Sequence, residues 1–187
     1  MNALTRRVVD LTELFDRLGV VYAVMGGLAV RMYGIPRATY DIDFTTAIER
    51  EQLPRLYKSI EKLGCTVPEA YESGWVDQVA GMPLVKLHLL VEDNGIDVDL
   101  FFAESPFQKS ILNRRRRTEI NGASAYLVSP EDLILLKLIA GRPRDFADVY
   151  DILFIQTSLD SDYMREWADH LGITDRPLQV LAGPPSI

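Results

Sequence analysis

Two aspartates separated by one residue, Asp41 and Asp43, are the side chains of this 187-residue chain best suited to chemistry. They lie in the segment Tyr40-Asp41-Ile42-Asp43-Phe44, whose polar–apolar alternation predicts a β-strand. Because successive side chains of a strand point to opposite faces, we expect both carboxylates on one face and Ile42 and Phe44 in the core. Carboxylates about 7 Å apart along a strand can share or bracket Mg²⁺, which also takes water and phosphate oxygens as ligands.

A second pair, Asp97 and Asp99, repeats this arrangement in the predicted strand 96–102. Either residue would supply a third carboxylate. Like charges on one face cost free energy unless a cation lies between them. A two-metal site of this kind binds a triphosphate, activates the attacking hydroxyl and stabilises the leaving pyrophosphate. The alternative is that each pair marks a solvated strand face. The presence of two pairs on neighbouring predicted strands favours the metal site.

The pair Gly26-Gly27 follows the apolar run 20–25, which predicts a buried strand, and precedes a short helix over 28–33. Glycines let backbone N–H groups approach a phosphate closely, and the start of the following helix offers its positive end. A Gly-Gly turn is common and is weak by itself. Its position between a buried strand and a helix, shortly before the aspartates, predicts a phosphate-binding turn.

Several other polar residues are candidates for binding a nucleotide. Arg37 is a candidate phosphate contact, and Thr39 lies on the same strand face as Asp41, where a structural role is equally compatible with the sequence. Lys137 interrupts the apolar helix segment 133–139. Such a lysine either extends to the surface or points into a cleft, where its ammonium group would contact the triphosphate.

Charged residues near the C-terminal helices have two interpretations each. Asp145 would orient Lys137 or the nucleotide, whereas Arg144 and Asp148 have the spacing of an ordinary helix-surface ion pair. The run 114–117 consists of four arginines. It predicts either a patch for RNA or another polyanion, or a solvated helix end, where cations are favoured.

The elements that must position these residues form an α/β (α+β) fold with a mixed sheet flanked by helices. Asn94-Gly95 and Asn121-Gly122 predict hairpins, and Ser129-Pro130 predicts a helix start. We divide the chain into a core over 1–105 and a region over 106–187, made of a hairpin and a mainly helical part packed on the core. Predicted helices span 3–18, 49–63, 130–140, 144–155 and 160–171, and predicted strands span 84–91, 96–102, 118–120 and 124–128.

Bulk composition narrows the classes of function. The net charge of −7 and the pI near 4.9 argue against a protein that coats nucleic acid. The single cysteine, Cys65, cannot form an intramolecular disulfide, and neither histidine has a partner at zinc-ligand spacing. The longest apolar run is short of the roughly 20 residues of a membrane span. We therefore expect a cytoplasmic protein that does not insert in a membrane.

The motifs together resemble a known superfamily. Gly26-Gly27 followed by Asp41-Ile42-Asp43 looks like the signature of the DNA polymerase β-like nucleotidyltransferases. The segment 34–44 is similar to the G-x-x-R-x-T-x-D-hydrophobic-D motif of the AbiEii-type toxin nucleotidyltransferases. The segments 129–148 and 98–100 also resemble that branch, and the latter favours Asp99 over Asp97 as the third carboxylate.

This resemblance implies a nucleotidyltransferase fold and transfer of a nucleoside monophosphate from an NTP to an acceptor hydroxyl. RNA, including the 3′ end of tRNA, is among the acceptors that it implies. The resemblance also implies two Mg²⁺ ions as cofactors and a cognate antitoxin as a potential partner. Asp41, Asp43 and Asp99 would be the catalytic metal ligands. The nucleotide would be bound by Gly26, Gly27, Arg37, Thr39, Lys137 and Asp145. The alternative is a non-catalytic module of the same fold that binds a nucleotide or a protein.

Overall fold

The computed structural model describes residues 3–68, 75–76, 81–91, 94–120 and 122–175. Its helices are α1 (Ala3–Leu18), α2 (Gly26–Tyr33), α3 (Leu53–Ile60), α4 (Pro106–Arg114), α5 (Pro130–Ala140), α6 (Pro143–Ile155) and α7 (Ser161–His170), with 3₁₀ turns η1 (Arg50–Gln52) and η2 (Glu61–Leu63). Its strands are β1 (Tyr22–Met25), β2 (Asp41–Thr46), β3 (Cys65–Thr66), β4 (Trp75–Val76), β5 (Pro83–Val91), β6 (Asn94–Phe102), β7 (Arg116–Ile120) and β8 (Ala123–Leu127).

These strands form one mixed sheet in the order β3-β5-β6-β2-β1-β8-β7, with β4 pairing to β5. At its centre, β2 runs antiparallel to β1 and parallel to β6. The β2–β6 register sets Asp41 opposite Asp97 and Asp43 opposite Asp99. The predicted neighbouring of the two aspartate pairs is therefore confirmed.

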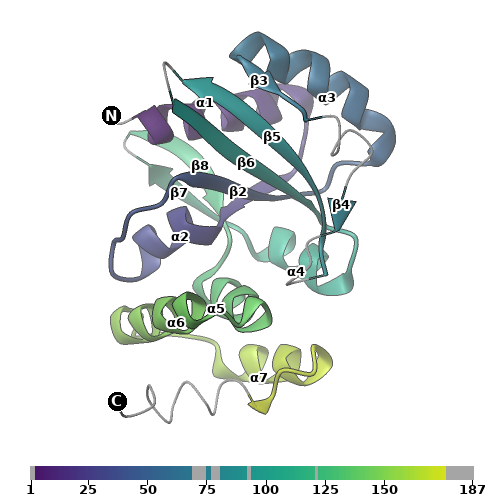
Figure 1. The fold of residues 1–187 in the computed structure, drawn as a ribbon. Coiled ribbons are helices and arrows are strands. Elements are labelled where there is room, and N and C mark those ends of the chain that lie inside the picture. Colours follow the sequence, from purple (N-terminus) through teal and green to yellow (C-terminus); the bar gives the residue numbers. More distant parts are fainter. Residues whose placement is uncertain (1–2, 69–74, 77–80, 92–93, 121, 176–187) are drawn as a thin grey trace.

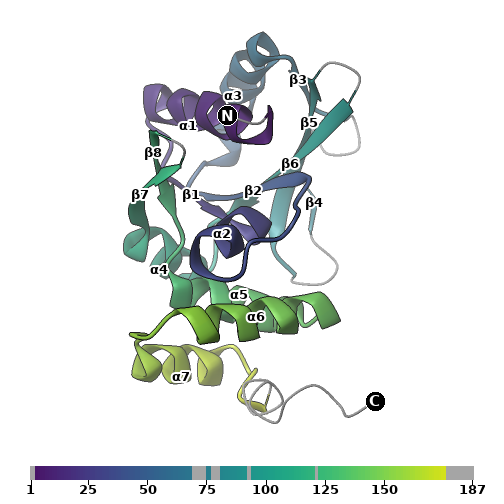
Figure 2. The same ribbon diagram turned by 90° about the vertical axis from the view of Figure 1, so that its left-hand side faces the viewer.

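Helices cover the two faces of the sheet differently (Figures 1 and 2). Helices α1 and α3 close one face, where the fully buried Ile42 and Phe44 pack among their apolar side chains. A second apolar cluster joins the opposite face of β1 to α2 and to the helices α4–α7. Because Ile42 and Phe44 point into the first cluster, Asp41 and Asp43 face the side occupied by α2 and α5, as the alternation predicted.

Most predicted elements are confirmed within a residue or two, but α4 was missed. Its start carries a clear signal, because Ser105 caps the helix and Gln108 returns a hydrogen bond to the Ser105 backbone, with Pro106 at the first turn. Helix α2 begins at Gly26, two residues earlier than expected. Both predicted hairpins form, but the prediction that Asn94-Gly95 makes the first turn is wrong, because both residues belong to β6 and pair with Val91 and Leu90. Residues 92–93 and Asn121 lie outside the described part.

The hairpin β7–β8 extends the central sheet, because β8 pairs in parallel with β1. The sheet therefore continues past residue 105, where the sequence division placed the end of the core. The part made of helices alone begins at Pro130. A search of the described helices for a segment sufficiently long and apolar to span a bilayer finds none.

Candidate active site

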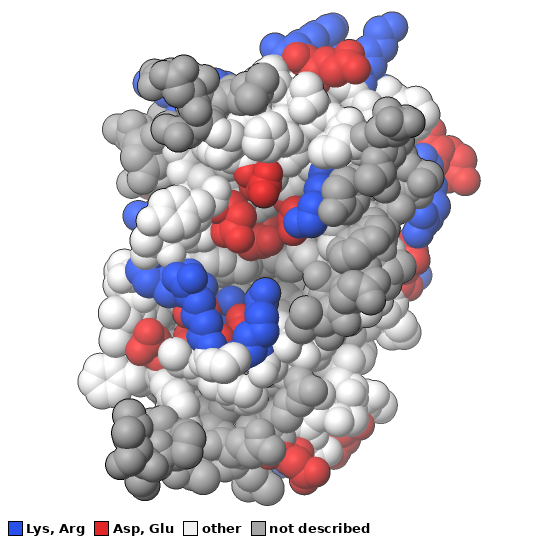
Figure 3. All heavy atoms as spheres, in the orientation of Figure 1, with Lys and Arg blue, Asp and Glu red and all other residues white. Residues whose placement is uncertain are grey.

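A cavity of about 350 Å³ lies between the sheet and the helices α5 and α6. All nine residues that the sequence assigned to metal or nucleotide binding line it. They come from four places in the chain, namely the β1–α2 turn, the segment 37–43, strand β6, and the α5–α6 pair. The lining includes Gly26, Gly27, Arg37, Thr39, Asp41, Asp43, Asp99, Lys137 and Asp145, together with Tyr40, Arg142 and Arg144. Figure 3 shows acidic side chains at the centre of this face and basic ones directly below them.

The sheet side of the cavity, which we call the acidic wall, consists of Asp41, Asp43 and Asp99. Burial, followed by the nearby charges of Asp41 and Asp99, raises the pKa of Asp43 to about 7 against the opposing effect of Lys137 and Lys86. Burial also raises the pKa of Asp99, although Lys86 acts against it. The acidic wall thus holds negative charge that the protein itself compensates only in part.

The two candidates for the third carboxylate differ in position. Asp99 lines the cavity, and the Lys86 ammonium donates to both of its carboxylate oxygens at 2.7 Å. Asp97 is exposed and pairs with the His88 imidazole at 2.9 Å. The sequence did not point to the ion pair of Lys86 with Asp99. The observed register pairs Val91 with Asn94 and so sets Lys86 opposite Asp99, whereas the predicted turn at Asn94-Gly95 implies a different register.

The glycine turn packs tightly under the same wall. Gly26 adopts a φ of +62°, and a Cβ atom there would collide with the Asp43 carboxylate. A Cβ atom on Gly27 would collide with the Thr39 side chain. Helix α2 starts at this turn without a side-chain cap, so its first backbone N–H groups remain as donors beside the cavity.

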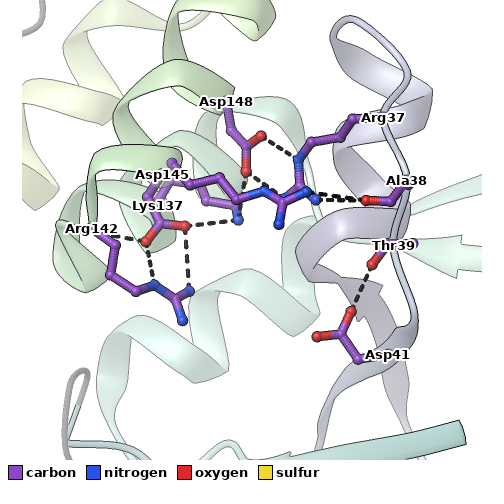
Figure 4. A network of polar contacts seen from close by, with 9 residues as sticks. Arg37, Ala38, Thr39, Asp41, Lys137, Arg142, Asp145 and Asp148 are labelled. Carbon is purple, nitrogen blue, oxygen red and sulfur yellow. Dashed lines mark hydrogen bonds and ion pairs between the residues drawn. The ribbon is translucent and has the colours of Figure 1, made fainter.

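The opposite side of the cavity carries a chain of ion pairs on α5 and α6, shown in Figure 4. The buried Lys137 ammonium lies 2.9 Å from Asp145 and 2.8 Å from Asp148. Arg142 donates to Asp145 at 2.6 Å. Burial alone would raise the pKa of Asp145, but Arg142 and Lys137 outweigh it and the pKa is lowered. Lys137 therefore points inward, and Asp145 orients it.

Arg37 ties this group to the strand that carries the aspartates. Its guanidinium group binds both carboxylate oxygens of Asp148, at 2.6 and 2.8 Å, across 111 residues of sequence. The same guanidinium group and that of Arg144 both donate to the Ala38 carbonyl at 3.2 Å. Thr39 donates to Asp41 at 2.6 Å. We call Arg37, Lys137, Arg142, Asp145 and Asp148 the helix clamp.

Two alternatives from the sequence are resolved by these contacts. The helix-surface pair of Arg144 with Asp148 is wrong, because Asp148 binds Arg37 and Lys137 while Arg144 reaches Ala38. The four arginines at 114–117 all make contacts within the chain. Their partners include Glu131 for Arg114 and Arg116, the Leu112 carbonyl and the Tyr126 ring for Arg115, and Ser124 for Arg117.

Whether the acidic wall suits Mg²⁺ depends on the number of available ligands. Among the described residues, no three or more His, Cys, Asp and Glu side chains stand together in an arrangement that could hold a metal ion. Asp99 is engaged by Lys86, which leaves Asp41 and Asp43. Two carboxylates are what Mg²⁺ commonly takes from a protein when phosphate oxygens and water complete its shell. The charges of Lys137 and Lys86 offset only in part the rise in the pKa of Asp43 that burial and the other two aspartates cause.

Solved structures share this fold at low sequence identity. A nucleotidyltransferase-like protein of Paracoccidioides brasiliensis is 20% identical with a TM-score of 0.56, over 98% of this chain and 94% of its own. The ANT(2″)-Ia complex with adenylyl-2″-tobramycin is 17% identical with a TM-score of 0.59, over 91% and 98%. The lincomycin-bound lincosamide antibiotic adenylyltransferase LnuA is 14% identical with a TM-score of 0.51, over 81% and 97%. The predicted nucleotidyltransferase-like α/β fold is thereby confirmed.

A comparison with curated proteins gives no match. A family of nucleotidyltransferases matches nearly the whole chain, over residues 2–174, and its description does not name the AbiEii-type branch that the sequence motifs resemble. The match includes every residue of the acidic wall, the glycine turn and the helix clamp. The chain therefore belongs to the family described as "Nucleotidyltransferase of unknown function (DUF6036)".

Proposed function

We propose that the chain transfers a nucleoside monophosphate from an NTP to an acceptor hydroxyl in a Mg²⁺-dependent reaction. The observation that carries this proposal is the partly buried Asp43 carboxylate, which lies beside Asp41 and opposite Asp99 on one wall of the cavity, with arginine and lysine side chains on the other. Such a cavity suits a ligand that brings both a cation and polyanionic phosphates.

The two walls of the cavity bind different parts of the ligand in this proposal. Asp41 and Asp43 hold Mg²⁺, which when bound neutralises developing charge on the phosphates. The backbone N–H groups of Gly26 and Gly27 and the cations of the helix clamp hold the triphosphate. Asp99 completes the acidic wall next to the position that the acceptor must take.

The reaction balances without a redox partner. The acceptor oxygen forms a bond to the α-phosphorus, and the bond from that phosphorus to the bridging oxygen of the β-phosphate breaks. Pyrophosphate leaves with the electron pair of that bond. The acceptor proton passes to the Asp99 carboxylate, as a general base requires, and then to solvent.

For the acceptor, we favour a hydroxyl of a small molecule over RNA. The arginines of the run 114–117 are engaged within the protein, and the net charge of −7 disfavours a long polyanion. One structure of similar fold is a lincosamide antibiotic adenylyltransferase, and another is in complex with adenylyl-2″-tobramycin. RNA or tRNA, and an antitoxin partner, are the competing proposals from the AbiEii-type resemblance.

The test is a transfer screen with the purified chain, each of the four α-³²P-labelled NTPs and Mg²⁺. Acceptor pools contain hydroxylated small molecules, total RNA or protein. Label is expected on a small molecule, and Asp41→Asn and Asp43→Asn should abolish it. Asp97→Asn is the matched control, because Asp97 lies on the same strand as Asp99 but is exposed and paired with His88. Transfer that persists in both Asp41→Asn and Asp43→Asn would overturn the metal role.

A second candidate is nucleotide binding without transfer. The observation that favours it is the engagement of Asp99 by Lys86, which leaves two carboxylates for an ion. Calorimetry with NTP and Mg²⁺ separates the two functions when combined with the screen. Tight binding without transfer to any of the three pools supports the binding module, whereas absence of binding contradicts both.

A further inference from the structure

We propose that the ring of Tyr40 is the stacking surface for the base of the bound nucleotide. The inference rests on the proposed function, because it assigns a place to the part of an NTP that the metal and phosphate groups leave unassigned. Tyr40 precedes Asp41 directly and lines the same cavity, so a base stacked on it would lie next to the ion and phosphate positions.

Tyr40 is the lining residue with an open aromatic face. Its side chain is 82% exposed, whereas Phe101, the other aromatic residue of the lining, is 7% exposed and packs in the second apolar cluster. Within the described part of the chain, no aromatic ring and no cation stacks on Tyr40. A single exposed aromatic is ordinary on a protein surface. One at the rim of a nucleotide-sized cavity offers the flat apolar face that a base requires.

The residues on both sides of Tyr40 make hydrogen bonds that hold its segment in place, although its ring is exposed. The Ala38 carbonyl accepts hydrogen bonds from Arg37 and Arg144, and Thr39 donates to Asp41. Arg37 is in turn fixed by its two bonds to Asp148. A ring carried on a fixed segment costs little conformational entropy when a ligand binds against it.

We assign Tyr40 to the base rather than to the acceptor because of the positions that the triphosphate and the acceptor must take. On the sheet, Asp99 belongs to β6, whereas the glycine turn follows β1 on the other side of β2. The acceptor must approach Asp99, and the triphosphate must lie against the turn. Tyr40 belongs to the segment whose Thr39 packs against Gly27, which is the triphosphate side.

Stacking on a tyrosine is tolerant of base identity, because every base has a π-face. Purines present more ring area than pyrimidines. We therefore expect the chain to bind all four NTPs with Mg²⁺, with ATP and GTP bound more tightly than CTP and UTP. This difference in affinity between purine and pyrimidine nucleotides should decrease when the Tyr40 ring is removed.

The experiment is calorimetry of the full chain with Mg²⁺ and, in turn, ATP, UTP and inorganic tripolyphosphate, which lacks the base and the ribose. Tyr40→Ala should weaken ATP binding about 5- to 100-fold and leave tripolyphosphate binding unchanged, while Tyr40→Trp retains ATP binding. Phe154→Ala is the matched control, because Phe154 is 81% exposed on α6 and does not line the cavity.

Two outcomes would overturn this inference without contradicting the proposed function. If Tyr40→Ala binds ATP as Phe154→Ala does, the ring does not contact the base. If Tyr40→Ala weakens ATP and tripolyphosphate equally, Tyr40 acts on the phosphate site through its segment. Failure of the unaltered chain to bind any of the three ligands would instead contradict the proposed function together with the inference.

Discussion

The acidic wall and the helix clamp face each other across one cavity, yet their aspartates behave in opposite ways. Burial and neighbouring carboxylates raise the pKa of Asp43 to about 7. Burial would also raise the pKa of Asp148, but hydrogen bonds from Arg37 and Lys137 outweigh it and the pKa is lowered. The protein thus supplies cations to the helix clamp and leaves the acidic wall short of them.

This difference distinguishes the helix clamp, whose residues stabilise the fold, from the acidic wall, whose residues we expect to bind a ligand. Ionised carboxylates that are buried with partners stabilise the folded chain, whereas those buried without partners destabilise it. A protein retains the second kind where function requires perturbed groups. We therefore expect substitutions in the acidic wall to lower activity more than stability. Substitutions in the helix clamp should mainly lower the stability of the fold.

The largest contrast is expected from Asp43→Asn. The variant should lose at least about 100-fold in transfer activity, more than is typical when a residue that only supports a metal ligand is changed. Its melting temperature should not fall, because the change removes a desolvated charge beside Asp41 and Asp99. Transfer assays and thermal denaturation without Mg²⁺ measure the two effects. Asp97→Asn, on the exposed pair with His88, should change neither.

Asp148→Asn should give the reverse result on stability. The substitution leaves Arg37 and the buried Lys137 without their shared carboxylate, so the free energy of unfolding should fall by about 3 kcal/mol. Urea denaturation measures it. The control is Asp162→Asn, which breaks an ion pair with Arg165 whose aspartate side chain is 94% exposed, and should change it by less than about 0.5 kcal/mol. A loss no larger than that of the control would show that the helix clamp does not hold the fold.

The sequence was sufficient for the Asp41–Asp43 pair of the acidic wall and insufficient for the Arg37–Asp148 pair of the helix clamp, because the two differ in the range of their interactions. Asp99 joins Asp43 through the pairing of β2 with β6, and only the resemblance favoured it over Asp97. Strand alternation places Asp41 and Asp43 on one face, since it depends only on neighbouring residues. The Arg37–Asp148 pair joins positions 111 residues apart, and no local pattern specifies it.

Local signals also differ in how directly they can be read. The cap of α4 at Ser105 is local and could have been predicted. The facing of Lys86 and Asp99 depends on the hairpin register, which differs from the one that a turn at Asn94-Gly95 implies. The insertion of β8 beside β1 could not have been predicted, because it joins strands about a hundred residues apart and creates part of the central sheet. The open ring of Tyr40 is likewise a property of the packed structure, since its sequence neighbours do not determine what covers it.

Acid should weaken the helix clamp in a defined pH window. The pKa of Asp145 and that of Asp148 are lowered from 3.8, so below about pH 4 the unfolded chain binds more protons than the folded one. The stabilisation is therefore complete above the unfolded pKa and is lost as the pH falls toward the folded values. Urea denaturation from pH 6 to pH 3 should show the gap between the unaltered chain and Asp148→Asn shrinking only below about pH 4. A gap that already closes at pH 6 would contradict this assignment.

The smallest effect should come from Lys86→Met, which removes a cation bound directly to Asp99 of the acidic wall. The pair is partly exposed, with side-chain exposures of 31% for Lys86 and 16% for Asp99, so solvent screens it. Mg²⁺ affinity, measured by calorimetry, should rise by roughly threefold, because Asp99 then adds its charge to that of Asp41 and Asp43. Lys58→Met, on the exposed side of α3, should leave the affinity unchanged. Weaker binding in Lys86→Met would instead show that Lys86 positions Asp99, and that part of the acidic wall is held together in the same way as the helix clamp.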